Sequence, residues 1–218
     1  MPLRFLSLAM LLSPGALAAQ TLGIPAGCQA ILTVQHASCR VAHYVTCSND
    51  APGVRHRVDV YPDGFDYIAA TDADGQWLGS VDAYAGTRDQ PAGPAANSVS
   101  FEALLRGSDS YDFSMIDAAG VVTRFTGTDT LTGETTTLDG ETVLPFTFEI
   151  KATNADGTED WSATGTAYAH PEWRIGFSGI TNWVVPGDAY STDDTPAALI
   201  EPGEPGFLST VAEFGCAS

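Results

Sequence analysis

The chain has 218 residues, of which 27 are acidic and 9 are basic, so its formal net charge is −18. This acid excess, with Lys151 as the single lysine, argues against nucleic-acid binding and against docking on an anionic membrane, since both need clustered basic residues. Hydrophobic residues make up 44% of the chain, which is enough for a buried core and argues against a largely disordered protein.

Residues 1–19 have the pattern of a secretory signal peptide. Arg4 supplies a short basic start, an apolar run follows, and Ala16-Leu17-Ala18 provides small residues for cleavage. The apolar run is far shorter than the roughly 20 residues of a membrane-spanning helix. We therefore predict an exported protein, periplasmic or extracellular, without a membrane span; a buried N-terminal helix is the alternative interpretation.

Four cysteines in an exported chain indicate two disulfides. Two strand-like segments joined by a tight turn place Cys28 opposite Cys47, at the short distance that a disulfide requires. Cys39 and Cys47 would lie about 26 Å apart along one strand, so the second bond is Cys39–Cys216. Metal binding is the alternative use of these cysteines, but their spacing matches no zinc pattern.

From residue 54 to residue 184 the chain repeats one unit, an alternating segment followed by a turn rich in Gly, Asp or Asn. The segments are 54–61, 65–71, 76–84, 98–106, 111–117, 121–129, 143–153, 158–169 and 172–184. Evenly spaced short strands of this kind predict an all-β fold. We expect an antiparallel meander that forms a barrel or a strongly curved or closed sheet of about nine to eleven strands.

This reading places a single all-β domain at residues 20–185, with residues 85–97 as an irregular link. A Pro- and Gly-rich tail follows at 186–218, pinned by its disulfide. The tail could wrap an edge of the sheet, plug one end of a barrel, or form a loose strap. The best candidate for a helix is a short turn at 208–214.

Large apolar side chains recur on one face of these strands, with polar ones on the other. The apolar face carries Phe65, Trp77, Val81, Phe101, Phe113, Met115, Phe125, Phe146, Phe148, Ile150, Trp161, Trp173, Ile175, Phe177 and Trp183. No helix is available to cover them, so the sheet must close as a barrel or fold over as a sandwich. Candidate bends are Gly79, Gly127, Gly165, Gly176 and Gly179. A membrane barrel shares the alternation but fits the cysteine-pinned tail less well.

Motifs for catalysis are absent from the sequence. No hydrolase pattern is present, and the Asp-Gly clusters are typical of hairpin turns rather than of calcium loops. His43 and His56 become diagonal neighbours if their strands pair, near enough for one metal or one shared proton. Hydrogen-bonded core histidines are the simpler interpretation, since no acidic third ligand is evident. We therefore predict no catalytic residues, no cofactor and no metal, and favour a non-enzymatic protein.

The aromatic residues suggest ligand binding, because a barrel of more than eight strands has room inside. The candidate lining residues are Trp77, Phe101, Phe113, Phe125, Phe148, Trp161, Trp173, Phe177, His43 and His56. The leading hypothesis is thus an exported barrel that binds a small apolar ligand; aromatics that simply fill the core are the alternative reading. Two other hypotheses remain, a structural or protein-interaction module of the periplasm or cell surface, and a histidine metal-binding protein.

Overall fold

The computed structural model describes residues 20–216, apart from the side chains at positions 65 and 66. The signal peptide predicted at 1–19 lies outside these residues and stays a prediction. The elements are β1 (Cys28–His36), β2 (Arg40–Cys47), β3 (Arg55–Tyr61), β4 (Gly64–Thr71), β5 (Trp77–Asp82), β6 (Thr87–Pro91), α1 (Phe101–Leu105), β7 (Ser108–Asp117), β8 (Val122–Leu131), β9 (Thr136–Leu138), β10 (Glu141–Asn154), β11 (Glu159–His170), β12 (Ile175–Val185), β13 (Asp188–Asp193) and β14 (Pro196–Ile200).

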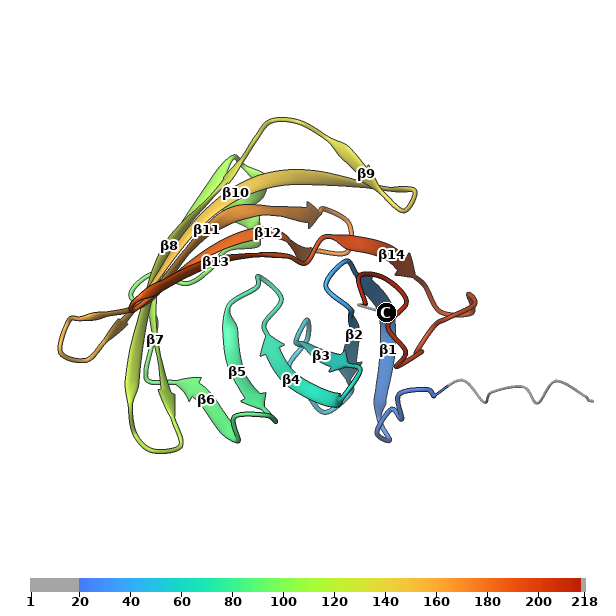
Figure 1. Ribbon diagram of the computed structural model, residues 1–218, viewed down its shortest axis with the longest axis horizontal. Coiled ribbons are helices and arrows are strands. Elements are labelled where there is room, and N and C mark those ends of the chain that lie inside the picture. The colour runs from blue at the N-terminus through green and yellow to red at the C-terminus, as the bar shows by residue number, and fades with distance from the viewer. Residues whose placement is uncertain (1–19, 217–218) are drawn as a thin grey trace, which may run out of the picture.

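The strands of the described residues form one fourteen-stranded sheet. Its order is β13-β12-β11-β10-β8-β7-β6-β5-β4-β3-β2-β1-β14, with β9 paired to β10 beside this path. Neighbours in the sheet are mostly neighbours in the chain, and they pair antiparallel, so the predicted meander is confirmed. Figure 1 shows the strong curvature: β10 to β13 arch over one side, β1 to β5 form the other, and β7 and β8 connect them.

The hydrogen-bonded path of the sheet ends at β13 on one side and at β14 on the other. These two strands are consecutive in the chain and are separated only by Asp194 and Thr195. The backbone N–H of Asp194 donates to the carbonyl oxygen of Gly179 in β12, and the N–H of Ala37, next to β1, donates to that of Thr195. The covalent chain therefore bridges the two ends of the sheet.

Two glycines mark places where neighbouring strands approach unusually closely. A Cβ on Gly165 would lie 2.2 Å from the carbonyl oxygen of Ile180, and one on Gly127 would lie 2.5 Å from that of Glu149. Only glycine fits such an approach, which a sharply bent sheet requires. Both positions were predicted bends.

The sheet has more strands than the nine to eleven expected. The expected link at 85–97 contains β6, and the expected tail supplies β13 and β14. Proline content suggested an irregular tail, but Pro196 occupies the first position of β14, at an end of the sheet, where its missing N–H is tolerated.

One predicted strand, at 98–106, is wrong in part, because it contains the helix α1. The Ser100 side chain caps this helix by accepting a hydrogen bond from the backbone N–H of Ala103 at 3.1 Å. Phe101 and Leu104, three residues apart, bury one face of it. Residues 208–214, the favoured helix candidate, are irregular. Among residues 20–216, no helix is long and apolar enough to cross a membrane.

Both predicted disulfides, Cys28–Cys47 and Cys39–Cys216, are present. Cys28 and Cys47 face each other in the β1–β2 ladder, as the proposed register requires. A bulge at Ile31 then shifts the register by one residue. The turn consequently ends at Cys39, whose φ of 57° places it in the left-handed region.

The end of the tail is a strap across β1. The Gln35 side chain donates to the carbonyl oxygen of Val211 and accepts from the backbone N–H of Glu213. The Cys39–Cys216 bond fixes the end of the strap. Among the placements considered for the tail, the structure therefore shows a fixed strap that follows two added strands.

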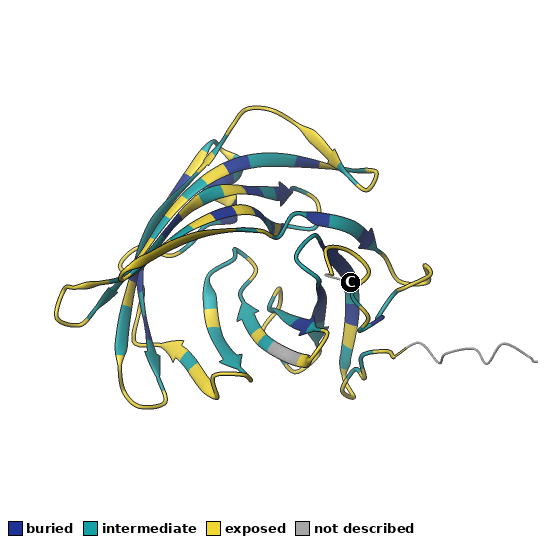
Figure 2. Cartoon of the chain, in the orientation of Figure 1, coloured by how far each residue is buried: buried dark blue, intermediate teal, exposed yellow. Residues whose placement is uncertain are grey.

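Burial alternates along the strands as the sequence pattern predicts. Figure 2 shows alternating bands of buried and exposed residues along β10, β11 and β12. In β7, Tyr111, Phe113 and Met115 are buried while the intervening residues are not. The buried side chains of this strand belong to the aromatic interior of the curved sheet.

Candidate ligand cavity

Two adjoining cavities lie within the curved sheet. The larger has a volume of about 520 Å³ and the smaller about 270 Å³; we name them the large chamber and the small chamber. They share lining residues, which we name the waist: Arg57, Tyr67, Trp77, Val99, Asp129, Phe146 and Gly176. The large chamber is within the size range of small-molecule sites.

Aromatic residues form a large part of the wall of the large chamber. Phe113, Phe148, Trp161, Phe177 and Trp183 contribute to it from β7, β10, β11 and β12. Ring contacts run across the strands, with centroid distances of 5.2 Å from Trp77 to Phe113 and 5.3 Å from Trp161 to Trp183. Such edge and tilted contacts fix the rings, so the wall is pre-formed.

The small chamber is covered by α1, whose Phe101 and Leu104 line it. Asp74 holds this cover in place from the turn between β4 and β5. Its carboxylate accepts from the Ser100 hydroxyl at 2.7 Å and pairs with Arg174 at 2.6 Å. Arg174 belongs to the β11–β12 connection, so three segments distant in sequence meet at this end of the site.

Most of the predicted lining residues lie at the two chambers. The predicted residues that do line them are Trp77, Phe101, Phe113, Phe148, Trp161 and Phe177. Phe125 is buried beside Phe113, its cross-strand partner, within the aromatic cluster. Trp173 instead stacks on His170, with ring centroids 3.9 Å apart and planes at 9°.

His43 and His56 do not face the chambers. Their register is the predicted one, with His43 opposite Val58 and His56 opposite Val45. Strand alternation places both on the opposite face from Tyr44 and Arg57, which line the small chamber. Neither histidine is among the residues that line the chambers, because β2 and β3 turn their histidine-bearing face to the other side of the sheet.

Each histidine has a local partner. His43 is fully buried, its Nδ1 lies 3.0 Å from the Thr33 hydroxyl, and desolvation by burial lowers its pKa to about 4. The Nε2 of His56 lies 2.7 Å from a carboxylate oxygen of Asp50. This arrangement corresponds to the hydrogen-bonded alternative considered for these residues.

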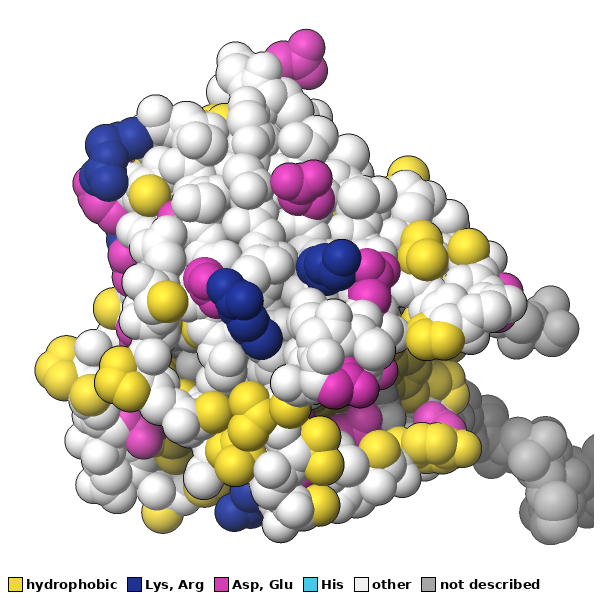
Figure 3. Space-filling view, turned by 90° about the vertical axis from the view of Figure 1, so that its left-hand side faces the viewer, with side chains coloured by type: hydrophobic (Ala, Val, Ile, Leu, Met, Phe, Trp, Pro, Cys, Tyr) yellow, Lys and Arg dark blue, Asp and Glu magenta, His cyan; other side chains and the backbone are white. Residues whose placement is uncertain are grey.

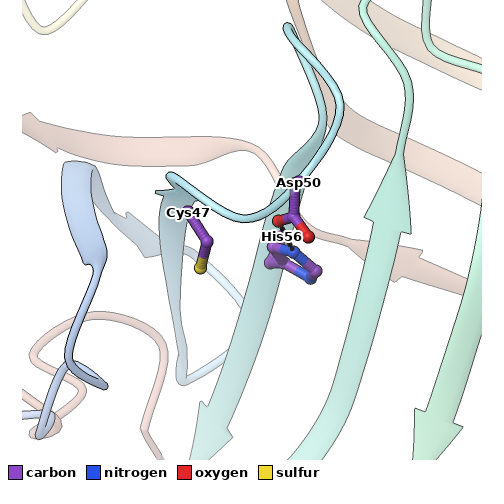
Figure 4. Close-up of side chains that lie close together, drawn as sticks. All are labelled: Cys47, Asp50 and His56. Atoms are coloured by element: carbon purple, nitrogen blue, oxygen red, sulfur yellow. Dashed lines mark hydrogen bonds and ion pairs between the residues drawn. The ribbon is translucent and has the colours of Figure 1, made fainter.

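One group of potential metal ligands occurs in the described residues, formed by Cys47, Asp50 and His56 within 4.8 Å (Figure 4). The sulfur of Cys47 is bonded to Cys28, so it has no thiolate to offer. Asp50 and His56 alone fall short of the three or four protein ligands of a zinc site. These residues do not fit a metal ion.

Sequence reasoning missed the charged residues at the waist, of which Arg57 is the first. Its Nη2 lies 3.1 Å from Asp59, which also accepts from Arg40 at 2.9 Å. Its Nε is buried and has no hydrogen-bond partner among the residues described. Burial disfavours its charge, but Asp59 and nearby tyrosines outweigh this and raise the pKa of Arg57, so it stays protonated.

The surface of Arg57 faces the interior. About a third of its side chain, 34%, is accessible although the residue lies at the waist of both chambers. The guanidinium is also 5.6 Å from the ring centroid of Tyr67. The chambers therefore contain a permanent positive charge that a ligand can reach.

Asp129 is the second missed residue. It lines both chambers from β8, directly opposite Asp109 in β7. Burial, followed by the charge of Asp109, raises the pKa of Asp129 to about 7, although a hydrogen bond from Tyr111 opposes this. This carboxyl therefore changes its charge near neutral pH, unlike Arg57.

A signal for these residues exists in the sequence. Alternate residues of a strand share a face, so Asp109 lies on the same face of β7 as Phe113, and Asp129 on the same face of β8 as Phe125. Each acid is therefore a polar residue on a face that otherwise carries inward-pointing apolar side chains. In β3 the inward row is polar throughout, and Arg57 lies within it.

The sequence matches no protein-family model, and comparisons with curated proteins and with solved structures gave no match.

Proposed function

We propose that this protein is a non-catalytic, exported carrier that binds a small, mainly apolar molecule in the large chamber. The observation that carries the proposal is a cavity of about 520 Å³ whose wall includes a fixed set of aromatic rings. A core with only a structural role would be packed to the density of a crystal, with few voids larger than a water molecule. Two disulfides are compatible with an exported setting.

The driving force for binding is the transfer of apolar ligand surface from water to the aromatic wall, worth about 0.8 kcal/mol for each buried CH₂ group. The chamber is pre-formed, so little ordering entropy opposes binding. Decanol is a suitable first probe, since it combines a flexible apolar chain with an uncharged end.

Titration with decanol should change the tryptophan fluorescence, because Trp77, Trp161 and Trp183 line the large chamber. It should also raise the melting temperature, since a ligand that binds only the folded state stabilises it. Unchanged fluorescence and an unchanged melting temperature across a panel of alcohols and aromatic compounds would count against the proposal.

Filling the chamber tests where the ligand binds. Ala163 is buried in β11 and lines the large chamber, so Ala163→Leu should occupy part of it and weaken decanol binding about tenfold or more. Thr164→Leu, at the next and exposed position, is the matched control and should bind decanol as the wild type does. Equal affinities in a folded Ala163→Leu variant and in the control would place the ligand elsewhere.

A further inference from the structure

We propose that the ligand is an amphiphilic carboxylate, with an acyl or aromatic body, and that Arg57 binds its carboxylate group. This inference rests on the proposed function and names the ligand class for the same site. It assigns the carboxylate to the waist and the apolar body to the large chamber.

The first support is the incomplete pairing of Arg57. A guanidinium has five N–H donors, which match a carboxylate in a bidentate arrangement. Two arginines share the carboxylate of Asp59: Arg40 pairs with its Oδ1 and Arg57 with its Oδ2. The Nε of Arg57 is buried and has no partner in the part of the chain that the structure describes, so a ligand would have to meet the terminal nitrogens of this guanidinium.

The second support is position. Arg57 lines both chambers and exposes part of its side chain to them, so a ligand atom in the large chamber can reach its terminal nitrogens. From the waist, the large chamber extends along Phe113, Phe148 and Trp161. A molecule anchored at Arg57 would therefore bury its apolar part against these rings.

The opposite ligand class, an organic cation, would use Asp129 instead. Burial raises the pKa of Asp129 to about 7, so below neutral pH its carboxyl group is mostly uncharged and does not attract a cation. Arg57 keeps its charge under the same conditions. Asp59 and Asp194 also line the large chamber, but both are paired with arginines. Arg57 is the one permanently charged residue of the waist, and its positive charge favours a carboxylate over an ammonium group.

Three probes with the same ten-carbon chain separate these classes: decanoate, decanol and decyltrimethylammonium. Their affinities are measured by calorimetry at about pH 6, where Asp129 is mostly protonated. The wild type should bind decanoate at least about tenfold more tightly than decanol, as expected for a hydrogen-bonded charge pair, and should bind the ammonium most weakly.

Two variants with the same change in net charge locate the effect. Arg57→Gln should lose the preference for decanoate while it still binds decanol. Arg124→Gln removes an exposed arginine paired with Asp112 and should keep the preference. The wild-type ranking tests the proposal even if Arg57→Gln does not fold.

Each other outcome is decisive. Equal binding of all three probes, tighter binding of the ammonium, or a decanoate preference that survives in Arg57→Gln would overturn the carboxylate assignment while leaving a ligand-binding barrel. Absence of binding by all three probes would instead overturn the proposed function.

Discussion

At the scale of single residues, the interior contains two kinds of charge. Arg57 is held in its charged form by Asp59, whereas Asp129 lies opposite Asp109 and has a raised pKa. Like charges placed directly opposite each other are destabilising, and the proton held by Asp129 relieves the repulsion. Among the other charged lining residues, Arg40 pairs with Asp59 and Asp194. The waist itself therefore has a fixed positive group and a carboxyl group whose charge depends on pH.

The raised pKa of Asp129 predicts a pH dependence of stability. Its folded-state pKa of about 7 lies above its ordinary value of 3.8, so between these limits the folded state binds a proton that the unfolded state has lost. The free energy of unfolding consequently falls as the pH rises through this window. Asp109 and Tyr111 face the carboxyl from β7, and Glu149 lies near Tyr111 on β10.

Asp129→Asn should remove this contribution, so its free energy of unfolding should fall less than that of the wild type between about pH 5 and about pH 8. Urea denaturation at both pH values measures the difference. Asp63→Asn, in an exposed turn, makes the same change in charge and should follow the wild type. Parallel curves for Asp129→Asn and the wild type would show that Asp129 titrates normally.

At the scale of elements, curvature depends on strand glycines. Gly165 in β11 has the carbonyl of Ile180 so close that a Cβ would lie 2.2 Å away, and its cross-strand partner Phe148 covers it. Gly176 in β12 has open space at the same position, with nothing within 4 Å. The two glycines thus differ in packing although both lie in strands.

Gly165→Ala should lower the free energy of unfolding by about 1–3 kcal/mol, since the strands must separate to accommodate the methyl group. Gly176→Ala should change stability by no more than about 0.5 kcal/mol. Denaturant unfolding of both variants checks this contrast. Similar stabilities would mean that the close approach at Gly165 is not needed for the bend.

The sequence predicts the strands and much of their register, because alternation and short turns are local signals. Cys28 opposite Cys47 and His43 opposite Val58 follow from counting residues across a turn. No local signal shows which face of β3 points inward. Its valines point away from the chambers, whereas Arg57 lines them. The cavity charges were missed because apolar residues were assumed to face the interior.

The remaining errors also have physical causes. The helix α1 was read as a strand because its five residues are too few to show a helical period, and only the Ser100 cap indicated it. The strand β14 was missed because its partner, β1, lies far away in the sequence. The strand β13 forms a local hairpin with β12, but the Pro-, Gly- and Asp-rich composition after residue 185 was taken as a sign of an irregular tail. The pairing of β14 with β1 depends on the curvature of the whole sheet.

At the scale of the whole molecule, the two end strands of the sheet, β13 and β14, are consecutive in the chain. The surface carries many acidic residues. Figure 3 shows one face, where Lys and Arg side chains lie beside Asp and Glu and apolar groups gather elsewhere. Exposed pairs such as Lys151–Glu159 and Arg124–Asp112 contribute little to stability. Stability must come mainly from the interior, which makes an unfilled chamber costly unless it has a use.

The most direct test of the account is a crystal structure of the protein with a decanol that carries bromine at its far end. The anomalous signal of bromine locates the far end of the bound decanol without ambiguity. We predict bromine in the large chamber, beside Phe113, Phe148 and Trp161. A chamber closed by its own side chains, with bromine only on the outer surface, would contradict the claim that this curved sheet binds its ligand inside.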